Sequence, residues 1–306
     1  MSANPLQDAI TINQSLKKPK NPKNIIQIVA HRSNSFRQKI LQAHFAKFNK
    51  NLSELIESEL SGNFRDTLVA LFSLPTDYDA FLLYKAMKGI GTNEDTLIEV
   101  LASRSNEEIK QIKKRYNEIY KRDLVKDVEK DTSGFFRKIL LELLNANRGT
   151  NTCPQEQECE ECARRLYDST IKLKGSEQDT FMYIFTQKSR EELCAISNIY
   201  FKWYGKTLIE IVDSIFKGDP RRVLKAIIYS LLSPSEYFAY RINKAVKGFG
   251  TNDSVLIRII VSRDEIDLYR IKRYYQQLYQ KTLYEEITKD TSGDYRDLLL
   301  ELIGKN

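Results

Sequence analysis

The sequence predicts an all-α protein built from four copies of one unit of about 70 residues. Apolar residues recur at helical spacing, and segments with the alternating pattern of β-strands are scarce in the 306 residues. The chain also matches itself: an offset of 159 places residues 85–144 on residues 244–303, with 26 of 60 positions identical. A match of this extent indicates duplicated structural units.

Two weaker copies follow from the same alignment. An offset of 72 places residues 31–34 on residues 103–106, and an offset of 84 places Gly175 on Gly91. Because glycine is favoured where the backbone needs a positive φ, recurrent glycines predict recurrent tight turns. We divide the chain into a short head, 1–14; repeat 1, 15–75; repeat 2, 76–144; a linker, 145–163; repeat 3, 164–233; and repeat 4, 234–306.

Each unit is expected to contain about five helices. In the second unit the apolar spacing predicts helices at 79–88, 93–102, 109–119, 124–128 and 135–144. Thr92 is suited to cap the second of these helices, and glycines stop the first. Applied to all four units, the pattern predicts about twenty helices.

The charge of the chain is unevenly distributed. The net charge is +7, and residues 1–75 alone carry +5. Two prolines place the lysines of one stretch on a loop; they are Lys17, Lys18, Lys20 and Lys23. Such an excess favours an anionic partner, which could be a lipid surface, a nucleic acid or an acidic protein. No apolar run approaches a membrane span and no apolar signal segment precedes the first unit, so we expect an intracellular protein.

A glycine loop and a distant acid recur at one spacing. Asp131 follows Met87 by 44 residues, and Asp290 follows Val246 by 44. Two glycines allow several carbonyl groups to point at one spot, and a carboxylate would complete a cage of oxygens, the ligands that Ca²⁺ prefers. The loop alone is equally consistent with a plain helix–helix turn.

The motif resembles that of the annexins. Met-Lys-Gly-x-Gly-Thr is separated by 38 residues from an acid, within four helical units, and the resemblance extends over about residues 16–303. It implies a curved α-helical disc that binds acidic phospholipid membranes through Ca²⁺ on its convex face. The implied metal ligands are the carbonyls of Met87, Gly89 and Gly91 with the Asp131 carboxylate, and likewise Val246, Gly248, Gly250 and Asp290. The short head and two divergent units also resemble the protist alpha-giardin branch of that family.

Repeats 1 and 3 depart from the motif. Repeat 1 has lysines in place of the loop glycines, although Glu59 stands at the acid position. In repeat 3 the acid position is Ile215. We therefore predict two Ca²⁺ sites, in repeats 2 and 4.

The residue between the two loop glycines is expected to contact lipid. It is apolar in repeats 2 and 4, Ile90 and Phe249, and basic in repeats 1 and 3, Lys18 and Lys174. We hypothesise that the lysines of repeats 1 and 3 contact anionic headgroups without calcium. The alternative is that these loops have lost a site and are merely solvated.

No catalytic constellation is evident. The two histidines, His31 and His44, lie in one unit, and no Ser/His/Asp or Cys/His set is plausible. The basic excess is confined to one quarter of the chain, so a nucleic-acid partner is not expected. The leading prediction is a non-enzymatic, calcium-dependent peripheral membrane protein on the cytoplasmic face of membranes. The alternative is a cytoskeleton-associated scaffold of the same fold that acts through protein partners.

Overall fold

Every regular element of the protein is an α-helix in the part of the chain that can be described. The computed structural model describes residues 4–172, 177–248 and 250–305, and twenty helices lie in these ranges. This arrangement confirms the all-α prediction. No helix within the same ranges has the length and apolar character needed to cross a membrane.

The helices fall into four sets of five. The first set is α1 (Pro5–Ser15), α2 (Pro22–Val29), α3 (Asn34–Phe48), α4 (Leu52–Glu59) and α5 (Gly62–Phe72). The second is α6 (Pro75–Met87), α7 (Glu94–Ser103), α8 (Asn106–Tyr120), α9 (Leu124–Asp131) and α10 (Gly134–Asn145). The third is α11 (Glu156–Lys172), α12 (Glu177–Gln187), α13 (Arg190–Tyr204), α14 (Leu208–Ile215) and α15 (Gly218–Leu232). The fourth is α16 (Pro234–Val246), α17 (Asp253–Arg263), α18 (Leu268–Tyr279), α19 (Leu283–Asp290) and α20 (Gly293–Ile303).

Helix α1 occupies the segment expected to be a short head. Its Asn4 cap accepts a hydrogen bond from the Leu6 N–H at 3.0 Å, and it buries Ala9 and Ile12 completely against α2 and α3. The segment therefore packs as the first helix of its set. Likewise, α11 begins at Glu156, inside the expected linker. The repeats were aligned on their glycine loops. Such an alignment does not detect the helix before the loop when most of that helix's surface is polar.

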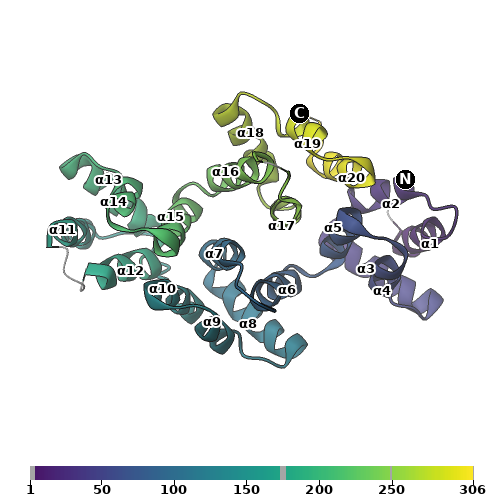
Figure 1. Ribbon diagram of the computed structural model, residues 1–306, viewed down its shortest axis with the longest axis horizontal. Helices are drawn as coiled ribbons and strands as arrows, with labels where there is room; N and C mark the ends of the chain where they lie inside the picture. Colours follow the sequence, from purple (N-terminus) through teal and green to yellow (C-terminus); the bar gives the residue numbers. More distant parts are fainter. Residues whose placement is uncertain (1–3, 173–176, 249, 306) are drawn as a thin grey trace. The chain divides into compact units, whose positions relative to one another are not determined.

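Two compact units make up the chain. One comprises Met1–Tyr78 and Ser235–Asn306, and the other Asp79–Pro234. In the first unit α5 packs against α17 and α20, and α2 packs against α20; in the second, α7 packs against α15, and α10 against α12 and α15 (Figure 1). Each unit thus joins two repeats through a shared apolar core.

A buried ion pair fixes the two helices that flank the loop of repeat 2. The Arg104 guanidinium donates to both carboxylate oxygens of Asp79, at 2.6 and 2.9 Å, and both side chains are more than nine-tenths buried. Arg32 contacts Asp8 in the same way at 2.7 Å in repeat 1. In repeats 1 and 2 an arginine therefore ties the end of the second helix of the repeat to the first helix.

Breaking this pair is expected to be costly. Asp79→Asn leaves a buried guanidinium without its counter-charge, so we expect a loss of about 3–5 kcal/mol in the free energy of unfolding. Urea unfolding followed by circular dichroism measures this loss. Glu118→Gln is the control, because Glu118 pairs at the surface with Arg115 and Lys114, and we expect a loss below about 1 kcal/mol. Equal losses in the two variants would contradict the assignment of Asp79 and Arg104 as a structural tie.

Candidate functional site

The glycine loop of repeat 2 connects α6 to α7 through left-handed backbone. Gly89 has φ +105° and Gly91 has φ +85°, values that side chains other than glycine rarely adopt. A Cβ atom added at either position would meet no atom within 4 Å. The conformation, not crowding, therefore requires glycine. Between them, Ile90 is fully exposed at 109%.

This loop leaves a set of carbonyl groups available. It is closed by one hydrogen bond, from the Asn93 N–H to the Ala86 carbonyl at 2.8 Å. The carbonyls of Met87, Gly89 and Gly91 accept no hydrogen bond from any residue that the structure describes. Three carbonyls without a protein partner in a single exposed loop are accessible to water or to a hard cation, which prefers oxygen ligands.

The acid-bearing turn lies directly beside this loop. Helix α9 ends at Asp131, and Gly134, with φ +59°, begins α10. The Thr132 hydroxyl donates to the Val128 carbonyl at 2.6 Å and so caps the end of α9. The Thr92 hydroxyl donates to the backbone carbonyl of Asp131 at 3.1 Å. This single bond fastens the loop to a turn that lies 39 residues away in sequence.

Repeat 4 reproduces the arrangement. The Asn252 N–H closes the loop onto Ala245 at 2.8 Å, and Gly250 has φ +92°. The Thr251 hydroxyl donates to the Asp290 carbonyl at 2.9 Å. Val246 is buried and Gly248 exposed, whereas Phe249 lies outside the described residues.

A polar bracket that the sequence reasoning missed supports the acid helix. The Tyr116 hydroxyl and the Arg122 Nε both donate to Asp127 Oδ2 at 2.7 Å. Hydrogen bonds from Arg122 lower the pKa of Asp127, and burial together with the bond to Asp127 raises the pKa of Tyr116. Asp127 therefore stays ionised and holds α9, one turn before Asp131, against the end of α8.

The bracket occurs only where the loop motif is intact. In repeat 4, Glu286 accepts from the Tyr275 hydroxyl at 3.4 Å and from Lys281 at 3.1 Å. The residues that align with Asp127 are Leu55 in repeat 1 and Ile211 in repeat 3. The sequence signal that could have revealed this cluster is that Asp127 aligns with another acid, Glu286, at the offset of 159 residues.

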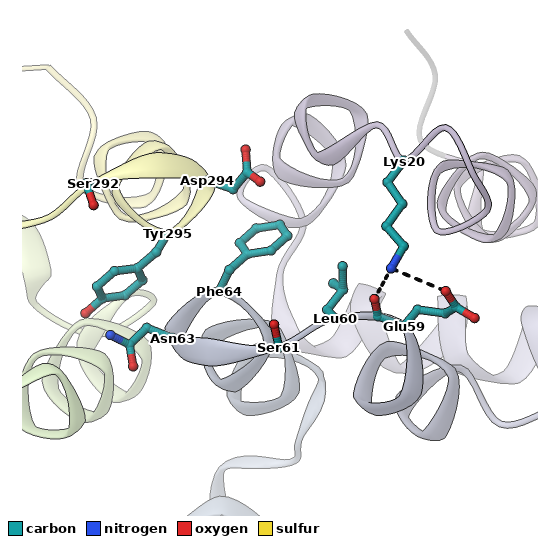
Figure 2. A pocket seen from close by; sticks show the side chains of 9 residues that line it. All are labelled: Lys20, Glu59, Leu60, Ser61, Asn63, Phe64, Ser292, Asp294 and Tyr295. Atoms are coloured by element: carbon teal, nitrogen blue, oxygen red, sulfur yellow. Dashed lines mark hydrogen bonds and ion pairs between the residues drawn. The ribbon is translucent and has the colours of Figure 1, made fainter.

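Repeat 1 is arranged differently. Its Lys20 ammonium donates to the backbone carbonyl of Glu59 and lies 3.4 Å from the Glu59 carboxylate, while Lys20 itself stays at the exposed surface. Lys17, Lys18 and Lys23 are exposed. The pair borders a cavity of about 470 Å³ between the starts of α5 and α20 (Figure 2). In repeat 3, Ile215 ends α14, and Lys174 lies outside the described residues.

The residue chemistry limits what kind of metal site is available. The described residues contain no group of three or more His, Cys, Asp or Glu side chains placed to hold a metal. Any cation at repeats 2 and 4 would therefore depend on backbone carbonyls with a single carboxylate, a set that suits Ca²⁺ better than zinc.

Comparisons with known proteins agree with this architecture. A family model described as Annexin matches residues 7–71, 78–143, 161–227 and 237–302. Annexin A7 of Homo sapiens is 42% identical over 281 residues, which cover 92% of this chain and 58% of that protein. The chain therefore spans a little over half the length of that relative.

Two solved structures show the same fold. Calcium-bound annexin (Sm)1 is 32% identical, with a TM-score of 0.89 over 99% of this chain and 90% of that one. Calcium-bound alpha-14 giardin is 22% identical, with a TM-score of 0.86 over 98% of each chain. The giardin likeness shows the fold alone, and assignment to that branch stays a prediction. The four matched repeats and the identity to annexin A7 establish that this chain belongs to the annexin family.

Proposed function

We propose that the protein binds acidic phospholipid membranes peripherally when Ca²⁺ occupies repeats 2 and 4. The observation that carries the proposal is the hydrogen bond that joins each glycine loop to its acid turn, Thr92 to Asp131 and Thr251 to Asp290. It sets a carboxylate beside a loop whose carbonyl groups are unpaired in repeat 2. Family membership supports the proposal, because annexins include calcium-dependent phospholipid-binding members and annexin (Sm)1 has been solved with calcium bound.

The residues of each site would supply only part of the coordination that calcium needs. Three carbonyls, of Met87, Gly89 and Gly91, and one carboxylate, of Asp131, provide about five of the six to eight oxygens of a calcium shell. The remaining positions would be open to water or to a lipid phosphate. Little ligand charge implies weak binding in solution, so lipid and two sites acting together would provide the useful affinity.

We further propose that this role is non-enzymatic and is exercised on the cytoplasmic face of membranes. The site would bind a cation through carbonyl groups and a carboxylate, and it carries an apolar side chain at the loop tip. No acid–base pair or nucleophile takes part in the arrangement described above. Calcium would act as a bridge between protein oxygens and lipid phosphate. The proposed partner is therefore an anionic lipid surface and not a nucleic acid.

Loss of both site carboxylates should weaken the calcium response. In Asp131→Asn/Asp290→Asn each site keeps its carbonyls but loses its one negative charge. We expect the calcium concentration for half-maximal co-sedimentation with phosphatidylserine liposomes to rise at least about tenfold.

A matched pair of neutralised carboxylates provides the control. Asp66→Asn/Asp297→Asn removes two charges that pair with adjacent surface arginines, and the calcium midpoint should stay unchanged. A normal calcium midpoint in the site variant would contradict the proposed ligands. No sedimentation of the wild type with or without calcium would instead favour the cytoskeletal scaffold.

The exposed loop tip of repeat 2 should contribute affinity without contributing to calcium coordination. Burial of a large apolar side chain in the membrane interface is favourable, so Ile90→Ala should weaken liposome binding about three- to tenfold at saturating calcium. Ile266→Ala, at another exposed isoleucine, is the control and should have no effect. Equal binding by both variants would exclude insertion of the loop tip.

The exposed lysines of repeat 1 should bind anionic liposomes without calcium. Each basic side chain near an anionic surface contributes up to ~1 kcal/mol and is weakened by salt. Replacing Lys17, Lys18 and Lys23 by Gln should therefore reduce binding in EGTA at low salt about tenfold or more, and should flatten its salt dependence.

Three lysines on other exposed surfaces provide the matched control for this experiment. They are Lys39, Lys110 and Lys114, all exposed. Replacing them by Gln changes the net charge by the same amount, so an equal loss of binding in both triple variants would show a non-specific charge effect. Unchanged binding by the repeat 1 variant would show that its lysines are merely solvated.

A further inference from the structure

Three equivalent hydrogen bonds join the first interhelical loop of a repeat to its acid position, and one of them differs in its donor. In repeats 2 and 4 the donor is a hydroxyl, of Thr92 and of Thr251. The offset of 72 residues relates Lys20 to Thr92 and Glu59 to Asp131. In repeat 1 the Lys20 ammonium donates to the backbone carbonyl of Glu59. The donor in this repeat therefore carries a positive charge.

That charge also reaches the acid side chain. The Lys20 Nζ lies 3.4 Å from Glu59 Oε2, and the two side chains are 32% and 38% exposed. Figure 2 shows the lysine extending from the loop after α1 onto both oxygen types of Glu59. A backbone carbonyl and a carboxylate are the oxygens that a bound cation would need. The ammonium donates to the backbone carbonyl as the Thr92 hydroxyl does in repeat 2, and it also lies beside the carboxylate that aligns with the proposed calcium ligand Asp131.

The loop of repeat 1 is closed in a way that removes another oxygen. The Asn21 N–H donates to the Ser15 carbonyl at 2.9 Å. The equivalent bond in repeat 2 runs from Asn93 to Ala86, one alignment position earlier. Ser15 aligns with Met87, so the carbonyl that matches the first proposed calcium ligand is already paired in repeat 1.

We propose that Lys20 is a built-in cation that replaces Ca²⁺ in repeat 1. Its ammonium holds the α1–α2 loop to the α4–α5 turn at every calcium concentration, and it makes Glu59 unavailable to the metal. Repeat 1 would then present its exposed lysines from a loop that is already ordered when repeats 2 and 4 are empty. The inference goes beyond the proposed calcium sites, because it concerns a repeat that does not respond to calcium.

Hydrogen exchange of the full chain, with and without calcium, tests this inference. We expect peptides covering residues 16–24 and 56–63 to exchange equally in both conditions in the wild type. Lys20→Gln should speed their exchange about two- to fivefold in both conditions, the factor that corresponds to an ion pair of this exposure. Lys20→Arg keeps the positive charge and should retain most of the protection.

Lys23→Gln is the matched control, because it removes an exposed lysine three residues away; it should leave exchange unchanged. Unchanged exchange in Lys20→Gln would overturn the proposal, as would an Arg variant as fast as the Gln variant. Slower exchange of the wild-type peptides on addition of calcium would also overturn it, since calcium would then bind beside Glu59. Peptides from repeat 2 in the same samples report separately on the proposed calcium sites, so the two proposals can fail independently.

Discussion

The arrangement of the candidate sites depends on one short contact, the hydrogen bond between the first loop of a repeat and the backbone carbonyl of its acid residue. Thr92 and Asp131 lie 39 residues apart, yet this bond sets the loop against the turn at 3.1 Å. Without it, a glycine loop and a carboxylate would be two separate surface features. With it, the loop and the acid turn lie side by side, as the proposed calcium sites require.

The rest of each repeat holds the two ends of that contact in place. The buried pair of Arg104 and Asp79 fixes the helices on either side of the loop. The bracket of Tyr116, Arg122 and Asp127 fixes the helix that carries the acid. The second of these supports is present in repeat 4, and the position of Asp127 is occupied by Leu55 in repeat 1 and Ile211 in repeat 3. The four repeats therefore share one helical arrangement but differ in the residues of the loop and of its support.

Repeat 1 shows how the same frame can serve a different purpose. The contact between loop and acid turn is kept, but its donor has become an ammonium. Unlike the threonine hydroxyls of repeats 2 and 4, this donor carries a positive charge and also lies beside the acid side chain.

The sequence by itself determined the helical class, the four repeats and the position of both loop motifs, because apolar spacing and glycine conformation are local properties. The prediction that Thr92 caps the second helix of its repeat was wrong: Asn93 is the cap, and the Thr92 hydroxyl donates to the Asp131 carbonyl. Only the tertiary structure decided that α1 packs as part of the first repeat, that Tyr116 and Arg122 converge on Asp127, and that Lys20 pairs with Glu59. Those contacts depend on which side chains meet when distant helices pack, and a long flexible lysine has many directions open to it until Glu59 is brought within reach.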